Sequence, residues 1–360
     1  MSLPLRLGPG NEAVIDGALA AGCTLLAGYP ITPATEILEV AADKFVKHGR
    51  IVVPAESEIA AIHMVAGASL AGHRAMTATS GIGLSLMSEA LSFFSGLSEL
   101  PGVVVVQQRW GPGDGSLGPG QDTYRQATRA AGHGDFRMIV LAPASVQETA
   151  DLVQLAFELA DKYRLFVLVL GDQVSALTTE TYRVPPPANG GRRENVFAAR
   201  SQSILPELVA VDSKAGDFDA IERLARRWEA KYQTIASTEP RHQVTGPDGE
   251  IDVLVVAYGS LARVVNAALP LLSDAGVTAG LFRPITLWPF PAAPLSAAAA
   301  RSGLIVTAEL SMGQLFEDVR LSVEGRDLRL LNWLGGVVPT PEELTRLIIK
   351  EVETQTGGPQ

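Results

Sequence analysis

The chain has 360 residues, of which 47% are hydrophobic and 19% charged, with a net charge of −10. This composition predicts about two folded domains with substantial cores and argues against a disordered chain. An acidic balance without a long basic run excludes nucleic acid as an expected partner. The N-terminus has no long apolar stretch, and the most apolar segments are far shorter than the roughly 18 residues that span a bilayer. We therefore expect a cytoplasmic protein with no membrane partner.

Short apolar runs alternate with helical patterns through the first half of the chain. The expected helices are Ser57–Ala71, Leu84–Phe94 and Ser145–Lys162, the last begun by Ser145 and Glu148 spaced as a capping box. This alternation predicts an α/β fold with a doubly wound parallel sheet covered by helices on both faces. The expected strands are Thr24–Ala27, Ile51–Val53, Ala75–Ala78, Val103–Gln107, Met138–Leu141 and Leu165–Leu170.

The composition changes near residue 185, at a stretch rich in proline and glycine that ends a helix or a central strand. A more polar segment follows, with one expected helix at Phe218–Tyr232. A second α/β unit begins at the apolar run Ile251–Ser260 and ends with a helix at Pro341–Val352. We therefore predict a first domain at 1–185, a connecting arm at 186–250 and a smaller second domain at 251–360.

Two strand-to-helix junctions lie close together near the N-terminus. In the first, GYPITPATEI, we expect Thr32 to be the N-cap and Pro33 the first helical residue. In the second, the helix of ESEIAAIHMVAGASLAG has Ser57 as its N-cap and Glu58 in its first turn. Both Thr32 and Glu58 thus follow the carboxyl ends of strands. Open α/β sheets bind their ligands at that edge.

Two further segments end at the same predicted edge. TATSGIG contains Ser80, Gly81 and Gly83 between a strand and a helix, and its glycines allow close approach of the backbone. VVVVQQR ends in Arg109, which we expect to leave a central strand. A planar guanidinium there is suited to a bidentate grip on a carboxylate. The alternative for Arg109 is a surface charge at the end of a strand.

The chain has one cysteine and five histidines. Cys23 lies in an apolar run, so we expect it to pack in the core. A single thiol cannot ligate an iron–sulfur cluster, which needs about four cysteines. The histidines lack metal-ligand spacing. His63 shares the helix of Glu58, where we expect core packing and keep a role in the pocket as the alternative.

Five motifs in order carry a resemblance: YPITP, the ESE-led helix, TATSGIG, VVVVQQR and RPITLWPFP at Arg283–Pro291. Together they resemble the α subunit of 2-oxoacid:ferredoxin oxidoreductases, over about residues 10–348. The resemblance implies a pyrimidine-binding-type domain followed by a smaller domain similar to the transketolase C-terminal domain. It also implies oxidative decarboxylation of a 2-oxoacid with coenzyme A to acyl-CoA, CO2 and reduced ferredoxin. It favours 2-oxoisovalerate or 2-oxoglutarate as substrate, ahead of pyruvate or an aryl glyoxylate.

The resemblance also implies roles for individual residues. Glu58 matches the catalytic glutamate that bonds N1′ of thiamine diphosphate, and Thr32 and Arg109 match substrate-binding positions. Glu56 lies two residues before Glu58, on the same side by strand alternation; we expect a structural role for it, and the alternatives are a place in the cofactor pocket or a pairing with a partner subunit. The cofactor-binding positions carried over from the family are Tyr29, Pro30, Ile31, Glu58, Ser80, Gly81 and Gly83.

The loop after Arg109 departs from the family. It reads WGPGDGSLGPGQDTY, and we expect Trp110 and Asp114 to influence which acyl group is accepted. Its GDG resembles the start of a magnesium–diphosphate motif, but the asparagine that should follow 25 to 30 residues later is missing. We therefore expect no metal site on this chain.

The missing metal and cluster ligands imply partners. The resemblance implies a β subunit that carries the thiamine diphosphate and Mg²⁺ motif, with the cofactor shared between subunits. Gamma and ferredoxin-like subunits or domains would carry the [4Fe-4S] clusters, and ferredoxin and coenzyme A complete the expected set. An alternative from a different class is a non-catalytic assembly subunit with a thiamine-enzyme fold. The presence of Thr32, Glu58 and Arg109 together argues against that alternative.

Overall fold

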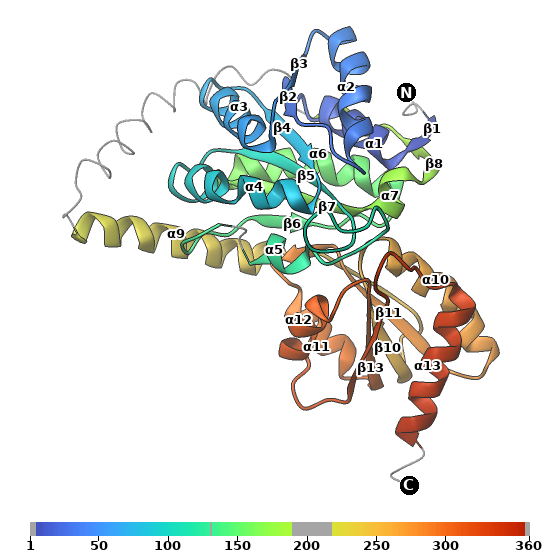
Figure 1. The fold of residues 1–360 in the computed structure, drawn as a ribbon. Coiled ribbons are helices and arrows are strands. Elements are labelled where there is room, and N and C mark those ends of the chain that lie inside the picture. Colours follow the sequence, from blue (N-terminus) through green and yellow to red (C-terminus); the bar gives the residue numbers. More distant parts are fainter. Residues whose placement is uncertain (1–4, 130–131, 189–217, 357–360) are drawn as a thin grey trace.

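The computed structural model describes residues 5–129, 132–188 and 218–356, so much of the predicted arm at 186–250 lies outside the described residues. The chain forms two α/β domains stacked one above the other, each built on its own sheet (Figure 1). Within the described ranges, the helices are too short or too polar to cross a membrane.

The first domain is built on a seven-stranded sheet with the order β12-β6-β7-β5-β4-β2-β3. All neighbouring strands are parallel except β12, which is antiparallel to β6. The central strand β5 is buried at every residue, as expected of a parallel strand covered on both faces. The strands are β2 (Leu25–Gly28), β3 (Ile51–Pro54), β4 (Ala75–Thr79), β5 (Gly102–Gln108), β6 (Ile139–Leu141), β7 (Phe166–Asp172) and β12 (Thr286–Trp288).

Helices cover both faces of this sheet, which confirms the doubly wound fold. Side chains of α1, α2 and α6 form a core on one face, and α3 and α4 pack on the other. A two-stranded ribbon of β1 (Leu5–Pro9) and β8 (Thr179–Arg183) lies beside α1. The helices are α1 (Gly10–Ala20), α2 (Thr35–Lys47), α3 (Glu58–Leu70), α4 (Gly81–Leu91), the π-helix η1 (Ser92–Leu97), α5 (Tyr124–Thr128), α6 (Val146–Tyr163) and α7 (Gln173–Leu177).

Local sequence signals explain where two of these helices begin. Ser57 accepts a hydrogen bond from the Ala60 amide, and Ser145 accepts one from the Glu148 amide, as predicted. The capping box at Ser145 is only half formed, however. The Glu148 carboxylate bonds the amide of Ala144 and pairs with Arg283 of the second domain instead of returning to the Ser145 amide.

The second domain has a five-stranded sheet with the order β14-β13-β10-β11-β9, in which β9 alone is antiparallel. Its strands are β9 (His242–Thr245), β10 (Ile251–Val256), β11 (Ala279–Pro284), β13 (Ser302–Glu309) and β14 (Leu328–Asn332). Helices α10 and α13 pack on one face, and α12 packs toward the first domain. The helices are α10 (Gly259–Asp274), α11 (Ala292–Ala299), α12 (Gln314–Ser322) and α13 (Pro341–Thr356).

Two strands pair with a sheet outside the segment in which the sequence places them. Strand β9 falls within the predicted arm but pairs with β11 of the second sheet, and β12 falls within the predicted second domain but pairs with β6 of the first. The predicted helix of the arm is α9 (Phe218–Thr238), which is longer than expected and extends beyond the first domain (Figure 1). The second sheet thus gains a strand from the arm, and the first sheet gains one from the segment predicted as the second domain.

A buried carboxylate anchors the segment that follows α9. Glu239 accepts hydrogen bonds from Lys162, Tyr163 and Arg241. Burial acts to raise the pKa of Glu239, but these hydrogen bonds outweigh it and lower that pKa to about 2. The ionised form of Glu239 therefore stabilises the connection between the C-terminus of α6 and the second domain.

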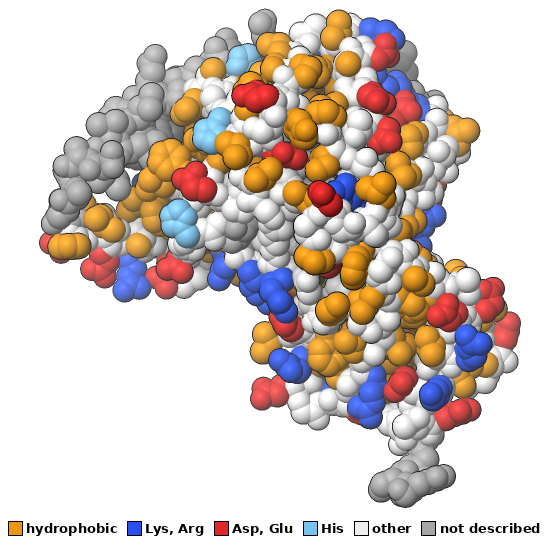
Figure 2. Space-filling view, viewed as in Figure 1, with side chains coloured by type: hydrophobic (Ala, Val, Ile, Leu, Met, Phe, Trp, Pro, Cys, Tyr) orange, Lys and Arg blue, Asp and Glu red, His pale blue; other side chains and the backbone are white. Residues whose placement is uncertain are grey.

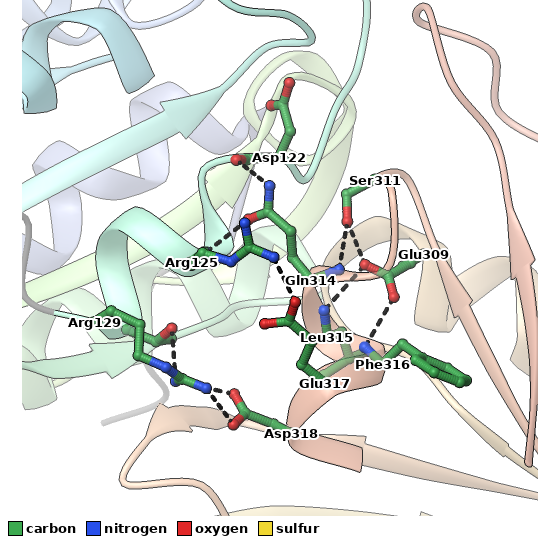
Figure 3. Close-up of polar contacts among 11 residues, drawn as sticks. Asp122, Arg125, Arg129, Glu309, Ser311, Gln314, Leu315, Phe316, Glu317 and Asp318 are labelled. Carbon is green, nitrogen blue, oxygen red and sulfur yellow. Dashed lines mark hydrogen bonds and ion pairs between the residues drawn. The ribbon is translucent and has the colours of Figure 1, made fainter. Parts of the chain in front are cut away.

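The junction between the domains is polar and specific (Figure 3). Asp318 of α12 pairs with Arg129 and accepts a hydrogen bond of 2.6 Å from the buried Tyr124 hydroxyl. Gln314 donates to the Asp122 carbonyl and accepts from the Arg125 amide. Because α5 and α12 are joined in this way, the loop after β5 is fixed against the second domain.

Candidate functional site

Four neighbouring strands of the first sheet, β3, β2, β4 and β5, end at the same edge. Glu58 follows β3, Thr32 follows β2, Ser80 follows β4, and Arg109 follows β5. The structure therefore brings the predicted catalytic, substrate-binding and cofactor-binding segments to the edge where open α/β sheets bind ligands. They form two groups: one around Glu58 and one around Arg109.

Glu58 lies at the first position of α3, and only 3% of the residue is exposed. Among the described residues, none donates a hydrogen bond to its carboxylate. The hydroxyl of the nearby Thr79 and that of Ser80, which follows it in the chain, are buried without a hydrogen-bond partner in the described part of the chain. Buried polar groups normally have partners, so this cluster retains capacity to bind a ligand.

Gly83 allows this cluster to form. A Cβ atom at this position would lie 1.9 Å from the Thr79 hydroxyl oxygen and 2.6 Å from Oε1 of Glu58. The backbone of α4 therefore approaches the glutamate as closely as only glycine permits. This close contact explains why the last position of the TSGIG motif is a glycine.

Arg109 and Thr32 are in direct contact. The guanidinium Nη1 of Arg109 donates a hydrogen bond of 3.0 Å to the Thr32 carbonyl, while its Nε is buried and has no partner in the described residues. Arg109 is half-buried at the end of the central strand, as predicted, and Thr32 is exposed. The contact fixes the orientation of the guanidinium and leaves donors available to an anion.

The prediction that Thr32 caps a helix at Pro33 is wrong. Helix α2 begins at Thr35, and its N-cap is Ala34. The Ala34 amide donates a hydrogen bond of 2.7 Å to the Ile31 carbonyl, so the segment closes a turn before the helix starts. Thr32 consequently lies within this turn, where its carbonyl is directed to Arg109.

Two residues that support this loop were missed by sequence reasoning. The buried Asn11 donates hydrogen bonds to the Pro33 carbonyl (2.7 Å) and to Glu36 (3.0 Å). Its own side-chain oxygen accepts a hydrogen bond of 3.1 Å from Gln107 of β5. The sequence signals for the two residues are weak, because helix α1 also contains the polar residues Glu12 and Asp16.

The loop after Arg109 folds onto itself. The Trp110 amide bonds the Gly118 carbonyl, and the Trp110 carbonyl accepts from the Ser116 amide, both at 2.9 Å. Trp110 is half-buried and Asp114 is exposed. The loop also contacts the second domain, because a Cβ at Gly118 would lie 2.7 Å from the Cα of Gly336. The predicted selectivity loop is therefore held from two sides.

The other predicted positions differ in exposure. Tyr29 and Pro30 are exposed and Ile31 is half-buried, so the loop presents its first residues to solvent. Gly81 adjoins Thr123, whose hydroxyl would lie 2.6 Å from a Cβ at position 81.

Three predictions outside the two clusters can be compared with the structure. Cys23 packs in the core as predicted, and burial raises its pKa to about 12. Glu56 is exposed. Core packing of His63 is wrong: its ring is exposed and stacks edge-on against Phe94, because that face of α3 points away from the sheet.

Two other carboxyl groups near the domain junction accept hydrogen bonds from backbone amides. Glu309 accepts hydrogen bonds from the amides of Leu315 and Phe316 at the start of α12 (Figure 3), and burial raises its pKa. Burial also raises the pKa of Asp122, which accepts from the Gly111 amide at 2.6 Å. In the described ranges, no three His, Cys, Asp or Glu side chains gather as a metal site.

Comparison with known families agrees with this geometry. Residues 16–234 match the family described as pyruvate flavodoxin/ferredoxin oxidoreductase, thiamine diphosphate-binding. Residues 251–344 match core domain II of pyruvate:ferredoxin oxidoreductase. This chain belongs to the 2-oxoacid:ferredoxin oxidoreductase family.

Two relatives are similar to this chain over nearly its whole length. The chain is 44% identical to the ketoisovalerate oxidoreductase subunit VorB of Methanothermobacter thermautotrophicus, over 91% of this chain and 92% of the relative. It is 33% identical to the 2-oxoglutarate synthase subunit KorA of the same organism, over 95% and 97%. The first relative is thus named as a subunit of a ketoisovalerate oxidoreductase and the second as a subunit of a 2-oxoglutarate synthase.

Solved structures extend the comparison to the fold. The 2-oxoglutarate:ferredoxin oxidoreductase of Magnetococcus marinus, with 2-oxoglutarate, coenzyme A and succinyl-CoA bound, matches with a TM-score of 0.83 and 29% identity. The match covers 97% of this chain and 65% of that one. A split-gene transketolase matches at a TM-score of 0.56 and 15% identity, which shows a shared fold alone.

Proposed function

We propose that this chain is the α subunit of a thiamine-diphosphate-dependent 2-oxoacid:ferredoxin oxidoreductase that forms acyl-CoA. The observation that carries the proposal is Glu58, a residue with only 3% of its surface exposed, whose carboxylate has no donor among the described residues and lies at the sheet edge that also holds the Thr32–Arg109 contact. A carboxylate held at a largely buried position without a hydrogen-bond donor can accept hydrogen bonds from a ligand. The aminopyrimidine ring of thiamine diphosphate has the matching hydrogen-bonding edge.

The residues around Glu58 fit that ring. Gly83 removes a side chain that would clash with the carboxylate, and the hydroxyls of Thr79 and Ser80 at the same sheet edge have no partner in the described part of the chain. Thiamine diphosphate, when bound, supplies the electron sink that makes loss of CO2 from a 2-oxoacid possible. The task of Glu58 is to accept a hydrogen bond from the aminopyrimidine ring and so to set the protonation state of that ring. The exposed Tyr29 and Pro30 belong to the loop that would face the ring.

The Arg109 cluster is suited to the substrate carboxylate. Its guanidinium is oriented by the Thr32 carbonyl and keeps donors for a second oxygen acceptor. A planar fork binds a carboxylate with geometric specificity as well as charge. We infer that Arg109 and Thr32 together hold the 2-oxoacid, while the loop from Trp110 adjusts the space for its side chain.

The substrate favoured by the comparisons is 2-oxoisovalerate. The relative named for ketoisovalerate is 44% identical to this chain, against 33% for the relative named for 2-oxoglutarate. A loop with a half-buried Trp110 offers apolar surface to a branched side chain. 2-Oxoglutarate is the second candidate because the matching solved structure holds it.

Partner subunits are part of the proposal. The GDG in the loop after Arg109 lacks its following asparagine, and one cysteine cannot ligate a cluster, so we infer that a β subunit holds Mg²⁺ and diphosphate and that other subunits or domains carry the [4Fe-4S] clusters to ferredoxin. Both domains expose hydrophobic side chains on one face (Figure 2). Among the described residues, Leu117, Met312 and Val337 are exposed and belong to loops near the domain junction. Exposed apolar surface of this kind is typical of subunit interfaces.

The test is reconstitution. The chain is co-expressed with subunits encoded beside it, and the purified complex is assayed for coenzyme A-dependent viologen reduction with 2-oxoisovalerate, 2-oxoglutarate, pyruvate and phenylglyoxylate. We expect turnover by the complex, fastest with 2-oxoisovalerate, and none by the isolated chain. A complex that assembles but oxidises none of the four acids would support the alternative of a non-catalytic assembly subunit.

A further inference from the structure

Asn11 connects the two elements that carry the Arg109 cluster. It lies at the start of α1, 22 residues before Pro33 and 96 before Gln107 in the sequence, and is fully buried. Its Nδ2 donates to the Pro33 carbonyl next to Thr32, and its Oδ1 accepts from Gln107, two residues before Arg109. One amide therefore bridges the Thr32 turn and the end of β5.

The helix that carries Asn11 is a rigid support. Cβ atoms at Gly10 and Gly17 would lie 2.1 Å from the Ser175 carbonyl oxygen and 2.3 Å from the Ala150 carbonyl oxygen. The backbone of α1 is thus packed directly against the chain at α7 and α6. A side chain fixed by such packing and by hydrogen bonds at both ends can hold neighbouring groups within a fraction of an ångström.

Gln107 is constrained in the same way. Its Nε2 donates to Asn11, and a Cβ at Gly171 of β7 would lie 2.2 Å from its Oε1. The side chain is therefore confined between α1 and β7. Any shift of Asn11 acts on the end of β5 as well as on the turn before α2.

We propose that Asn11 is a positioning residue for substrate binding, which sets the distance between the Thr32 carbonyl and the Arg109 guanidinium. The proposal rests on the proposed function, since it assigns Asn11 to the grip on the 2-oxoacid carboxylate. Within the described residues, the side chain of Asn11 makes its hydrogen bonds to Pro33, Glu36 and Gln107 and none to Glu58. Its removal should therefore weaken binding of the 2-oxoacid and spare coenzyme A.

The test uses the complete complex with the substitution Asn11→Asp. Aspartate has nearly the same shape but loses both donors, and its new oxygen would face the Pro33 carbonyl and Glu36. We expect the KM for 2-oxoisovalerate to rise about tenfold or more, as fits the loss of two hydrogen bonds, with an unchanged KM for coenzyme A. The matched control is Asn332→Asp, which removes a 3.0 Å hydrogen bond to the Ser311 carbonyl in the second domain and should leave both constants unchanged.

A double-mutant cycle separates positioning from a structural role. If Asn11 acts through Arg109, then Asn11→Asp combined with Arg109→Lys should lower kcat/KM by clearly less than the product of the two single effects. The proposal would be overturned if Asn11→Asp raised the KM for coenzyme A as much as the KM for 2-oxoisovalerate. It would also be overturned if the double variant lowered kcat/KM by the full product of the two single effects.

If the Asn11→Asp complex does not assemble, Gln107→Glu is used for the same test, because it removes the hydrogen bond from Gln107 to the Asn11 side-chain oxygen. It should raise the KM for 2-oxoisovalerate selectively. Failure of both variants to assemble would assign Asn11 to the fold and overturn its positioning role. A wild-type complex without activity on any 2-oxoacid would refute the proposed function itself, and the assignment of Asn11 with it.

Discussion

Replacing Gly83 with alanine is a minimal perturbation of the Glu58 cluster. The added methyl group would lie 2.6 Å from both Cγ and Oε1 of Glu58 and 1.9 Å from the Thr79 hydroxyl oxygen. Thr79 belongs to the buried strand β4, whereas the Glu58 carboxylate is the free end of a side chain. Because the contact with Thr79 is the shorter one, the Thr79 side chain must shift as well as the Glu58 carboxylate.

The size of the movement follows from these distances. Restoring ordinary contact at 3.4 Å from a starting distance of 2.6 Å requires the Glu58 oxygen to move by about 0.8 Å. A misplacement of about 1 Å in a catalytic group costs on the order of 10²-fold in rate. We predict a loss of this order in kcat for Gly83→Ala, with little change in the KM for the 2-oxoacid.

The assay is coenzyme A-dependent viologen reduction by the reconstituted complex. The matched control is Gly67→Ala in α3, the helix of Glu58, where nothing lies within 4 Å of the new Cβ. That control should keep full activity and gain up to about 1 kcal/mol of stability from the better helix former. Wild-type kcat in a well-folded Gly83→Ala complex would refute the account of the cluster.

Three further predictions concern other parts of the chain. Arg109→Lys should lower kcat/KM about 10- to 100-fold for every 2-oxoacid in steady-state kinetics, because a hydrogen bond to a charged group is worth about 1.5–3 kcal/mol. An unchanged kcat/KM would show that Arg109 does not bind the substrate carboxylate. Trp110→Gly keeps the backbone bonds of its loop but should change the ranking of the four acids toward bulkier ones, so a uniform effect on all four rates would contradict a role in selection. Glu239→Gln should reduce the free energy of unfolding by about 1–3 kcal/mol at pH 7. Because the pKa of Glu239 is lowered from 4.5 to about 2, its contribution is complete above pH 4.5 and is lost as the pH falls toward 2, so chemical denaturation of both proteins should converge there.

Much of the fold could be predicted because its signals are local. The alternation of apolar runs and helical patterns specified the first sheet, and Ser57 and Ser145 marked helix starts by chemistry that acts within three residues. The strands β9 and β12 could not be assigned to their sheets. Each is short and pairs with a strand from another part of the chain, which local sequence does not encode.

The candidate site divides in the same way. Glu58 and Arg109 were predicted because each follows a recognisable strand, and the motifs around them resemble a known family. Asn11 was missed because its partners lie 22 and 96 residues away, and only the folded chain brings them together. The cap expected at Thr32 failed because a hydrogen-bonded turn delays the start of α2.

The central claim, that Glu58 is the catalytic carboxylate of a 2-oxoacid oxidoreductase, is tested most directly by Glu58→Gln in the reconstituted complex. The amide keeps the size of the side chain but cannot hold the negative charge. We predict that the complex assembles normally and that coenzyme A-dependent oxidation of 2-oxoisovalerate falls by about 10²-fold or more. A variant complex that turns over 2-oxoisovalerate at the wild-type rate would contradict the claim.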